Sequence, residues 1–153
     1  MIVLDTAYLI DFFIGTKETL GAFEITEIDD LDIALDFDSD IATTVITFHE
    51  IMSGVKHKKV KKEERFFRRF FSETPVLNFD FKAAEKSSEI MADLLTMGKS
   101  VNALDVLIAG IAVANGADKI ASTDKRFDEI SKVTGLKILK SNFQEKKDSA
   151  SSV

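Results

Sequence analysis

The chain has 153 residues, one Pro, no Cys, no Trp and a net charge of −6 from 20 basic and 26 acidic side chains. This length and 45% apolar residues predict one domain with a buried core. The lack of Cys excludes disulfide scaffolds, thiolate zinc sites, iron–sulfur sites and a Cys nucleophile. No apolar run approaches the ~18 residues of a membrane span, and no signal peptide precedes the first residues, so a cytoplasmic protein without a membrane partner is expected.

The first predicted element is a buried strand over residues 1–5, an apolar run with β-branched members. A helix over 6–15 follows, and Gly15 is expected to end it. Residues 24–40 hold eight acids and no base, and apolar residues alternate with mostly acidic positions within this segment. This pattern predicts an acidic insertion with an extended conformation. A second buried strand is predicted over 41–46.

A helix opened by a Thr47-x-x-Glu50 capping box is predicted after the second strand. Residues 56–69 hold eight bases and two acids. An aromatic stripe at helical spacing lies in the same region, formed by Phe66, Phe67, Phe70 and Phe71. The stripe is expected to be core, with at least one ring facing a partner because two adjacent pairs span more than one helix face.

The second half of the chain alternates short strands with helices. Strands are predicted over 75–79, 119–122 and 136–139, and helices over 82–97, 102–115 and 125–131. Residues 144–153 are polar and are expected to form a frayed tail, which leaves 1–143 as the domain. The alternation predicts an α/β fold with a parallel sheet covered on both faces, in which ligands gather at the carboxyl ends of the strands.

Four acids fall where this sheet would bind a ligand. Asp5 closes the first strand, Glu50 follows the second, and Asp124 follows the strand over 119–122. Helix capping is the favoured explanation for each of these three when it is taken alone. Asp105 lies in the first turns of an otherwise apolar helix, with no basic residue one turn away on either side. A carboxylate there is costly to bury without a partner.

Taken together, these carboxylates predict a metal centre. Several carboxylates at one site repel one another and raise each other's pKa values. Their oxygens are hard ligands suited to Mg²⁺ or Mn²⁺, and a chain with no Cys and two His supports no other metal site as readily. A bound divalent ion polarises a phosphodiester and lowers the pKa of a bound water. We therefore predict metal-dependent phosphodiester hydrolysis, with catalytic and metal-binding residues Asp5, Glu50, Asp105 and Asp124.

The four acids lie in four segments: I-V-L-D-T-A-Y-L-I-D, T-T-V-I-T-F-H-E-I-M-S-G-V, N-A-L-D-V-L-I-A-G-I-A-V-A-N-G-A and I-A-S-T-D-K-R-F-D-E-I. In this order they resemble the motifs of PIN-domain ribonucleases, and most closely those of VapC-type toxins of prokaryotic toxin–antitoxin pairs. The resemblance covers roughly residues 1–139. It implies an α/β/α sandwich with a mainly parallel sheet, one or two Mg²⁺ or Mn²⁺ ions, and endonucleolytic cleavage of RNA.

The resemblance also implies partners and supporting residues. The hydroxyls of Thr6 and of Ser122 or Thr123 would support the acids, a small antitoxin would bind the protein, and helices near the aromatic stripe would form a homodimer. The chain departs from the family pattern in three places. Arg126 stands where Asp or Asn is common, Leu104 stands where many relatives have a polar residue, and the segment 24–40 is longer than usual.

The basic run over 56–69 is predicted to bind RNA phosphates beside the acids, and its alternative is a solvated helix face. The residues chosen for this role are Lys56, Lys58, Lys59, Lys61 and Lys62. The segment 24–40 carries −8, which leaves the rest of the chain at +2, so the net charge is compatible with an RNA partner. Two other functions stay open: a PIN-domain nuclease of RNA processing, and a non-catalytic module that binds RNA or protein. A phosphoacceptor receiver domain fits the spacing poorly.

Overall fold

A computed structural model describes residues 1–20 and 40–140 of the protein, which contain a five-stranded sheet in the order β3-β2-β1-β4-β5. The strands are β1 (Ile2–Leu4), β2 (Ile41–Thr44), β3 (Val76–Leu77), β4 (Lys119–Ala121) and β5 (Lys137–Leu139). Every pairing is parallel, so the carboxyl ends of all five strands lie at one edge. The predicted α/β class with a parallel sheet is confirmed.

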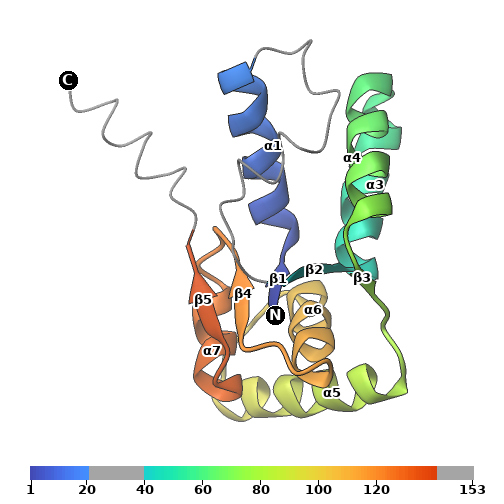
Figure 1. The fold of residues 1–153 in the computed structure, drawn as a ribbon. Helices are drawn as coiled ribbons and strands as arrows, with labels where there is room; N and C mark the ends of the chain where they lie inside the picture. Colours follow the sequence, from blue (N-terminus) through green and yellow to red (C-terminus); the bar gives the residue numbers. More distant parts are fainter. Residues whose placement is uncertain (21–39, 141–153) are drawn as a thin grey trace, which may run out of the picture.

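Helices cover both faces of this sheet (Figure 1). The described helices are α1 (Thr6–Leu20), α3 (Val45–Lys58), α4 (Lys61–Glu73), α5 (Phe81–Thr96), α6 (Ala103–Ala114) and α7 (Phe127–Thr134). Side chains of a strand alternate between faces, and Ile2 and Leu4 join a core cluster with α1, α3 and α4. Val3, between them, joins a second cluster with α5, α6 and α7. The sheet is therefore the middle layer of the predicted α/β/α sandwich.

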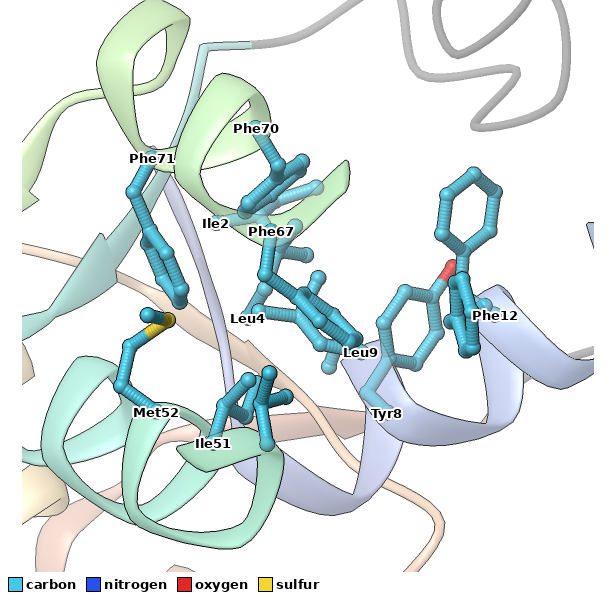
Figure 2. Close-up of a cluster of buried hydrophobic side chains, with 13 residues drawn as sticks. Ile2, Leu4, Tyr8, Leu9, Phe12, Ile51, Met52, Phe67, Phe70 and Phe71 are labelled. Atoms are coloured by element: carbon cyan, nitrogen blue, oxygen red, sulfur yellow. The ribbon is translucent and has the colours of Figure 1, made fainter. Parts of the chain in front are cut away.

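The cluster on the first face is rich in aromatic rings. Figure 2 shows rings of α4 pointing toward side chains of α1 and α3. Phe66 and Phe67 lie with ring centroids 4.8 and 5.0 Å from that of Phe13 on α1, and Phe71 lies 5.0 Å from Phe48 on α3. Helix α4 thus packs against α1 and α3 at the same time, and these two helices cover the two sides of its aromatic stripe. Three rings are buried and Phe66 is half-buried against Phe13, which agrees with the expected core role, and a ring facing a partner stays a prediction.

The second face contains a close contact between helices α5 and α6. At Gly110 of α6, an added Cβ would lie 2.6 Å from the Cβ and 2.8 Å from the Cα of Ser87 on α5. Real Cβ atoms do not approach so closely, so only glycine lets the two helix backbones meet here. Since α6 also begins beside the carboxyl edge of the sheet, this contact fixes the helix that carries Asp105.

Several predicted boundaries are wrong. The strand expected over 75–79 covers only Val76–Leu77, and the helix expected over 125–131 is Phe127–Thr134. Helix α1 continues past Gly15 to Leu20, because an interior glycine costs only about 1 kcal/mol relative to alanine. The second strand ends at Thr44, and α3 starts at Val45. The basic run does not lie on one helix: α3 ends at Lys58, and Lys59 takes a left-handed φ of 60° before α4 begins.

Two predicted segments lie outside the described residues. They are the acidic insertion over 24–40, of which only Asp40 is described, and the polar tail over 144–153. Both stay predictions, as does the domain boundary at 143. Within residues 1–20 and 40–140, no helix combines the length and the apolar character needed to cross a membrane.

Candidate metal centre

The four predicted acids come from four elements that end or begin at the carboxyl edge of the sheet. Asp5 follows β1, Glu50 lies in the second turn of α3, Asp105 lies in the first turn of α6, and Asp124 follows β4. Their charges act on one another. Asp105 and Asp124 raise the pKa of Asp5, and Asp124 and Glu50 raise the pKa of Asp105. The structure therefore brings together the four side chains singled out in the sequence.

Asp5 is the most buried member of this group, with 2% of its surface exposed. Its Oδ1 accepts a hydrogen bond from the backbone N–H of Tyr8 at 2.7 Å, and its Oδ2 accepts one from the Ser122 hydroxyl at 2.5 Å. Asp5 thus caps α1 and also belongs to the acidic group. Burial raises its pKa from 3.8 to about 7, against the two hydrogen bonds, which lower it.

Glu50 is held by hydroxyl groups. The hydroxyl of Thr6 donates to Glu50 Oε1 at 2.8 Å and lies 3.2 Å from the hydroxyl oxygen of Thr47. The predicted capping box of Thr47 and Glu50 is wrong, because Thr44 caps α3 by accepting the N–H of Thr47 at 3.2 Å. An N-cap three residues earlier places Glu50 in the second turn, where its carboxylate reaches the start of α1.

Asp105 carries the least satisfied oxygen of the group. Its side chain is 14% exposed, and Oδ2 is buried without a hydrogen-bond partner among the described residues. Arg126 Nε lies 4.0 Å from that oxygen, which is an ion-pair distance and too long for a hydrogen bond. Burial raises the pKa of Asp105 to about 6, although the charge of Arg126 opposes the shift. A buried carboxylate oxygen without a donor is suited to a cation.

Asp124 is occupied by Arg126. Asp124 Oδ1 accepts a hydrogen bond from the backbone N–H of Arg126 at 2.9 Å, and Oδ2 accepts one from Nε–H at 2.9 Å. Arg126 Nη2 forms an ion pair with the same Oδ2 at 2.7 Å. These bonds lower the pKa of Asp124. Asp124 is not the N-cap of a helix starting at Lys125, because α7 begins at Phe127 and Arg126 occupies its N-cap position.

The donor set fits a hard divalent cation in chemistry and in charge. Carboxylate oxygens are the ligands of Mg²⁺ and Mn²⁺, two of the four acids have raised pKa values, and one buried oxygen lacks a donor. The arrangement of the side chains fits a metal ion less well than their chemistry does. In residues 1–20 and 40–140, no three His, Asp or Glu side chains are arranged so that they could hold a metal ion together. The acids have separate partners, which are the hydroxyl of Ser122 for Asp5, the hydroxyl of Thr6 for Glu50 and the guanidinium of Arg126 for Asp124.

The predicted supporting residues are placed differently from one another. Ser122 and Thr6 bond directly to Asp5 and Glu50, and Ser122 also accepts the backbone N–H of Asp124 at 3.0 Å. Thr123 is half-buried, and in the described part of the chain no hydrogen bond joins its hydroxyl to one of the four acids. The residue whose role sequence reasoning missed is Arg126. Its position was noted only as a departure from the family pattern, and its spacing of two from Asp124 was the available signal.

The RNA-binding role of the five lysines stays a prediction. All five are exposed, at the end of α3, in the connection that follows it and at the start of α4. Lys58 lies eight residues after Glu50 on α3, which corresponds to roughly 12 Å along the helix axis. The basic surface therefore lies beyond the acids along α3, at a distance that a few nucleotides of an RNA strand would span.

The family model of the PIN domain matches residues 2–133. Solved structures with a similar fold include VapBC2 from Rickettsia felis bound to a DNA fragment from their promoter, at 20% identity and a TM-score of 0.67, covering 92% of this chain and 99% of that chain. VapBC-5 from Mycobacterium tuberculosis, of the VapBC family of toxin–antitoxin systems, has 22% identity and a TM-score of 0.64, with 91% and 97% covered.

A third similar structure is VapBC-1 from nontypeable Haemophilus influenzae, at 16% identity and a TM-score of 0.67, covering 92% of this chain and 98% of that chain. At such identities the likeness shows the fold, and it extends over nearly the full length of both chains. No curated protein matches the sequence.

Proposed function

We propose that this protein, which belongs to the PIN domain family, is a divalent-metal-dependent endoribonuclease and the toxin of a VapBC-type toxin–antitoxin pair. The observation that carries the proposal is the gathering of four carboxylates at the carboxyl edge of the sheet, two of them with raised pKa values. A structural role alone does not explain a buried Asp105 oxygen that has no hydrogen-bond donor within residues 1–20 and 40–140.

In this proposal Asp5, Glu50, Asp105 and Asp124 hold one or two Mg²⁺ or Mn²⁺ ions. A bound ion would supply Lewis-acid polarisation of the phosphodiester and a water of lowered pKa. The chain's own groups orient the carboxylates: the Ser122 hydroxyl and the N–H of Tyr8 fix Asp5, and the Thr6 hydroxyl fixes Glu50. These donors are uncharged, so they set the direction of each carboxylate without cancelling its charge.

The toxin role is supported by the fold. Similar structures are VapBC assemblies from three bacteria, and the likeness covers more than nine-tenths of this chain. On this basis we propose a small antitoxin as partner, a homodimer, and a cytoplasmic RNA as substrate. The exposed lysines at the end of α3 and the start of α4 are proposed to bind its phosphates, because a surface that binds RNA must lie apart from the acids that repel it.

The test compares RNA cleavage by wild type, Asp105→Asn and the control Asp93→Asn, which changes an exposed acid of α5. Wild type and the control should cleave with Mg²⁺ or Mn²⁺ and stop with EDTA. Asp105→Asn should lose about 100-fold or more, since a lost metal ligand removes several kcal/mol of transition-state stabilisation. EDTA-resistant cleavage, or full activity of Asp105→Asn, would contradict the proposed chemistry.

The toxin role has a test of its own. Induced expression in a bacterial host should arrest growth with the wild-type protein and with Asp93→Asn, and should not do so with Asp105→Asn. Cleavage of RNA in vitro without any growth arrest would favour the alternative of a nuclease in RNA processing.

A further inference from the structure

The guanidinium of Arg126 lies within the acidic group. Its Nε and Nη2 lie 2.9 and 2.7 Å from Asp124 Oδ2, and its Nε lies 4.0 Å from Asp105 Oδ2, which has no hydrogen-bond partner among the described residues. The charges of Asp105 and Glu50 also act on Arg126, after that of Asp124. One cationic side chain therefore compensates three of the four carboxylates.

The contacts of Arg126 differ in kind from those of the other supporting groups. Asp5 and Glu50 accept hydrogen bonds from neutral hydroxyl and backbone donors, which a divalent cation beside the same carboxylate would tolerate. Arg126 instead brings a full positive charge within ion-pair distance of both Asp105 Oδ2 and Asp124 Oδ2. Two like charges about 4 Å apart repel strongly in a partly desolvated site, so Arg126 and a divalent ion cannot share this position.

The side chain of Arg126 is able to leave. It is 59% exposed, whereas the carboxylates it contacts are 14% and 21% exposed. Arg126 precedes α7, and its backbone N–H bond to Asp124 Oδ1 does not depend on where the guanidinium lies. Rotation of the side chain into solvent would thus break its contacts with Asp124 Oδ2 without disturbing the turn or the core.

We propose that Arg126 is an internal counter-ion, which occupies the cation position beside Asp105 and Asp124 in the metal-free protein and is displaced when a divalent cation binds. The inference rests on the proposed function only in requiring that these acids bind such a cation. The free energy of cation binding then includes the cost of separating Arg126 from Asp124. The affinity of the wild-type protein for metal is lowered by that amount, and loss of the guanidinium restores it.

The test is calorimetric titration of the full chain with Mn²⁺ at pH 7.5, using wild type, Arg126→Gln and Arg68→Gln. Arg68 is a matched control, because it is 52% exposed, its Nη2 lies 3.1 Å from Glu64 Oε1, and it lies on α4 away from the acids. Arg126→Gln should bind Mn²⁺ about tenfold more tightly than wild type, and Arg68→Gln should bind like wild type. Equal affinities of wild type and Arg126→Gln would overturn the inference.

A second readout follows the guanidinium itself in the unmodified protein. The NMR signal of the Arg126 Nε–H, assigned by its loss in Arg126→Gln, should shift during a Mg²⁺ titration with the same midpoint as metal binding. A signal that stays in place while Mg²⁺ binds would overturn the displacement. If both wild type and Arg126→Gln failed to bind Mn²⁺, the metal centre of the proposed function would be contradicted as well. If both proteins bound Mn²⁺ with equal affinity, only the inference about Arg126 would be contradicted.

Discussion

Helix α6 carries two regions built on opposite principles. In its first turn, Asp105 has a pKa raised to about 6 and a buried carboxylate oxygen that no described residue supplies with a hydrogen bond. Further along the same helix, Gly110 packs so closely on Ser87 that a Cβ would lie 2.6 Å from the Ser87 Cβ. The Gly110 region stabilises the fold through contact, whereas the Asp105 region destabilises it through burial of charge.

The difference shows how the fold tolerates an acidic centre. Most of helix α6 is buried. Its buried residues are Val106, Ile108, Ala109, Gly110, Ile111 and Ala112. Removal of this apolar surface from water stabilises the helix position and offsets the unfavourable electrostatics at its first turn. A substitution at Asp105 should therefore remove activity and raise stability, whereas a substitution at Gly110 should lower stability and leave the acidic centre in place.

The largest effect is expected at Asp105. At pH 7.5 in the absence of metal, Asp105→Asn should raise the free energy of unfolding by about 1–3 kcal/mol, because wild type must keep a poorly solvated carboxylate charged there. The same variant should be inactive on RNA. Urea denaturation of both proteins measures the change, and a variant less stable than wild type at this pH would break the comparison.

Reversal of the lysine charges should change function and leave stability alone. Lys58→Glu with Lys59→Glu, or Lys61→Glu with Lys62→Glu, should weaken RNA binding by about tenfold at low salt and flatten its dependence on salt concentration. Each exposed substitution should change the free energy of unfolding by no more than about 0.5 kcal/mol. Fluorescence anisotropy over a salt series gives the affinities.

The control for these reversals is Lys82→Glu with Lys137→Glu, which has the same change in net charge on exposed positions of α5 and β5. The control pair should weaken RNA binding far less than either test pair. Equal losses for all three pairs would show that net charge, and no particular surface, governs binding.

The opposite combination is expected at Gly110. Gly110→Ala should lower the free energy of unfolding by a net ~1–2 kcal/mol, because a contact with the Ser87 backbone places the overpacking cost at about 2–3 kcal/mol and alanine returns about 1 kcal/mol of helix propensity. Metal binding at the acids should persist in the folded variant. Thermal unfolding measures the loss.

The smallest effect is expected at Gly54 of α3, where a Cβ would meet nothing within 4 Å. Gly54→Ala should raise the free energy of unfolding by about 0.5–1 kcal/mol through helix propensity alone. The pair of glycine variants thus tests whether close contact, and not helix propensity, decides the sign at Gly110. Two shifts of the same sign would argue against the contact.

The sheet and the identity of the acids follow from local patterns in the sequence. Short apolar runs between helical patterns predict the parallel sheet, because such strands need cover on both faces. Asp105 is conspicuous since its helix offers no basic partner one turn away. The order β2-β1-β4 then places the residues after these three strands side by side, and the family pattern predicts the same set of acids.

The details that local patterns miss depend on contacts between distant residues. Thr44 and Thr47 are both suitable N-caps for α3, and the pairing of Thr44 with Leu77 of β3 keeps Thr44 at the end of β2. No Gly or Pro marks the break between α3 and α4, which occurs at a lysine with positive φ. The bond from Ser122 to Asp5 joins residues 117 positions apart, so only the assembled sheet reveals it.

The stability of the folded protein should depend on pH through two acids of the proposed metal centre, Asp5 and Asp105. The folded-state pKa values of Asp5 and Asp105 are raised from 3.8 to about 7 and about 6, so the folded protein binds protons more tightly than the unfolded chain. Their contribution to stability is fully present below about pH 4 and is lost as pH rises through 6 and 7. A divalent cation stabilises the charged forms and should oppose this loss.

The most direct test measures the unfolding temperature of wild type and Asp105→Asn between pH 4.5 and 8, with EDTA or with Mn²⁺. In EDTA, wild type should lose stability relative to Asp105→Asn as pH rises. Saturating Mn²⁺ should restore the stability of wild type above pH 6 and have little effect on the variant. Identical profiles of wild type with and without Mn²⁺ would contradict the claim that these acids form a cation-binding centre.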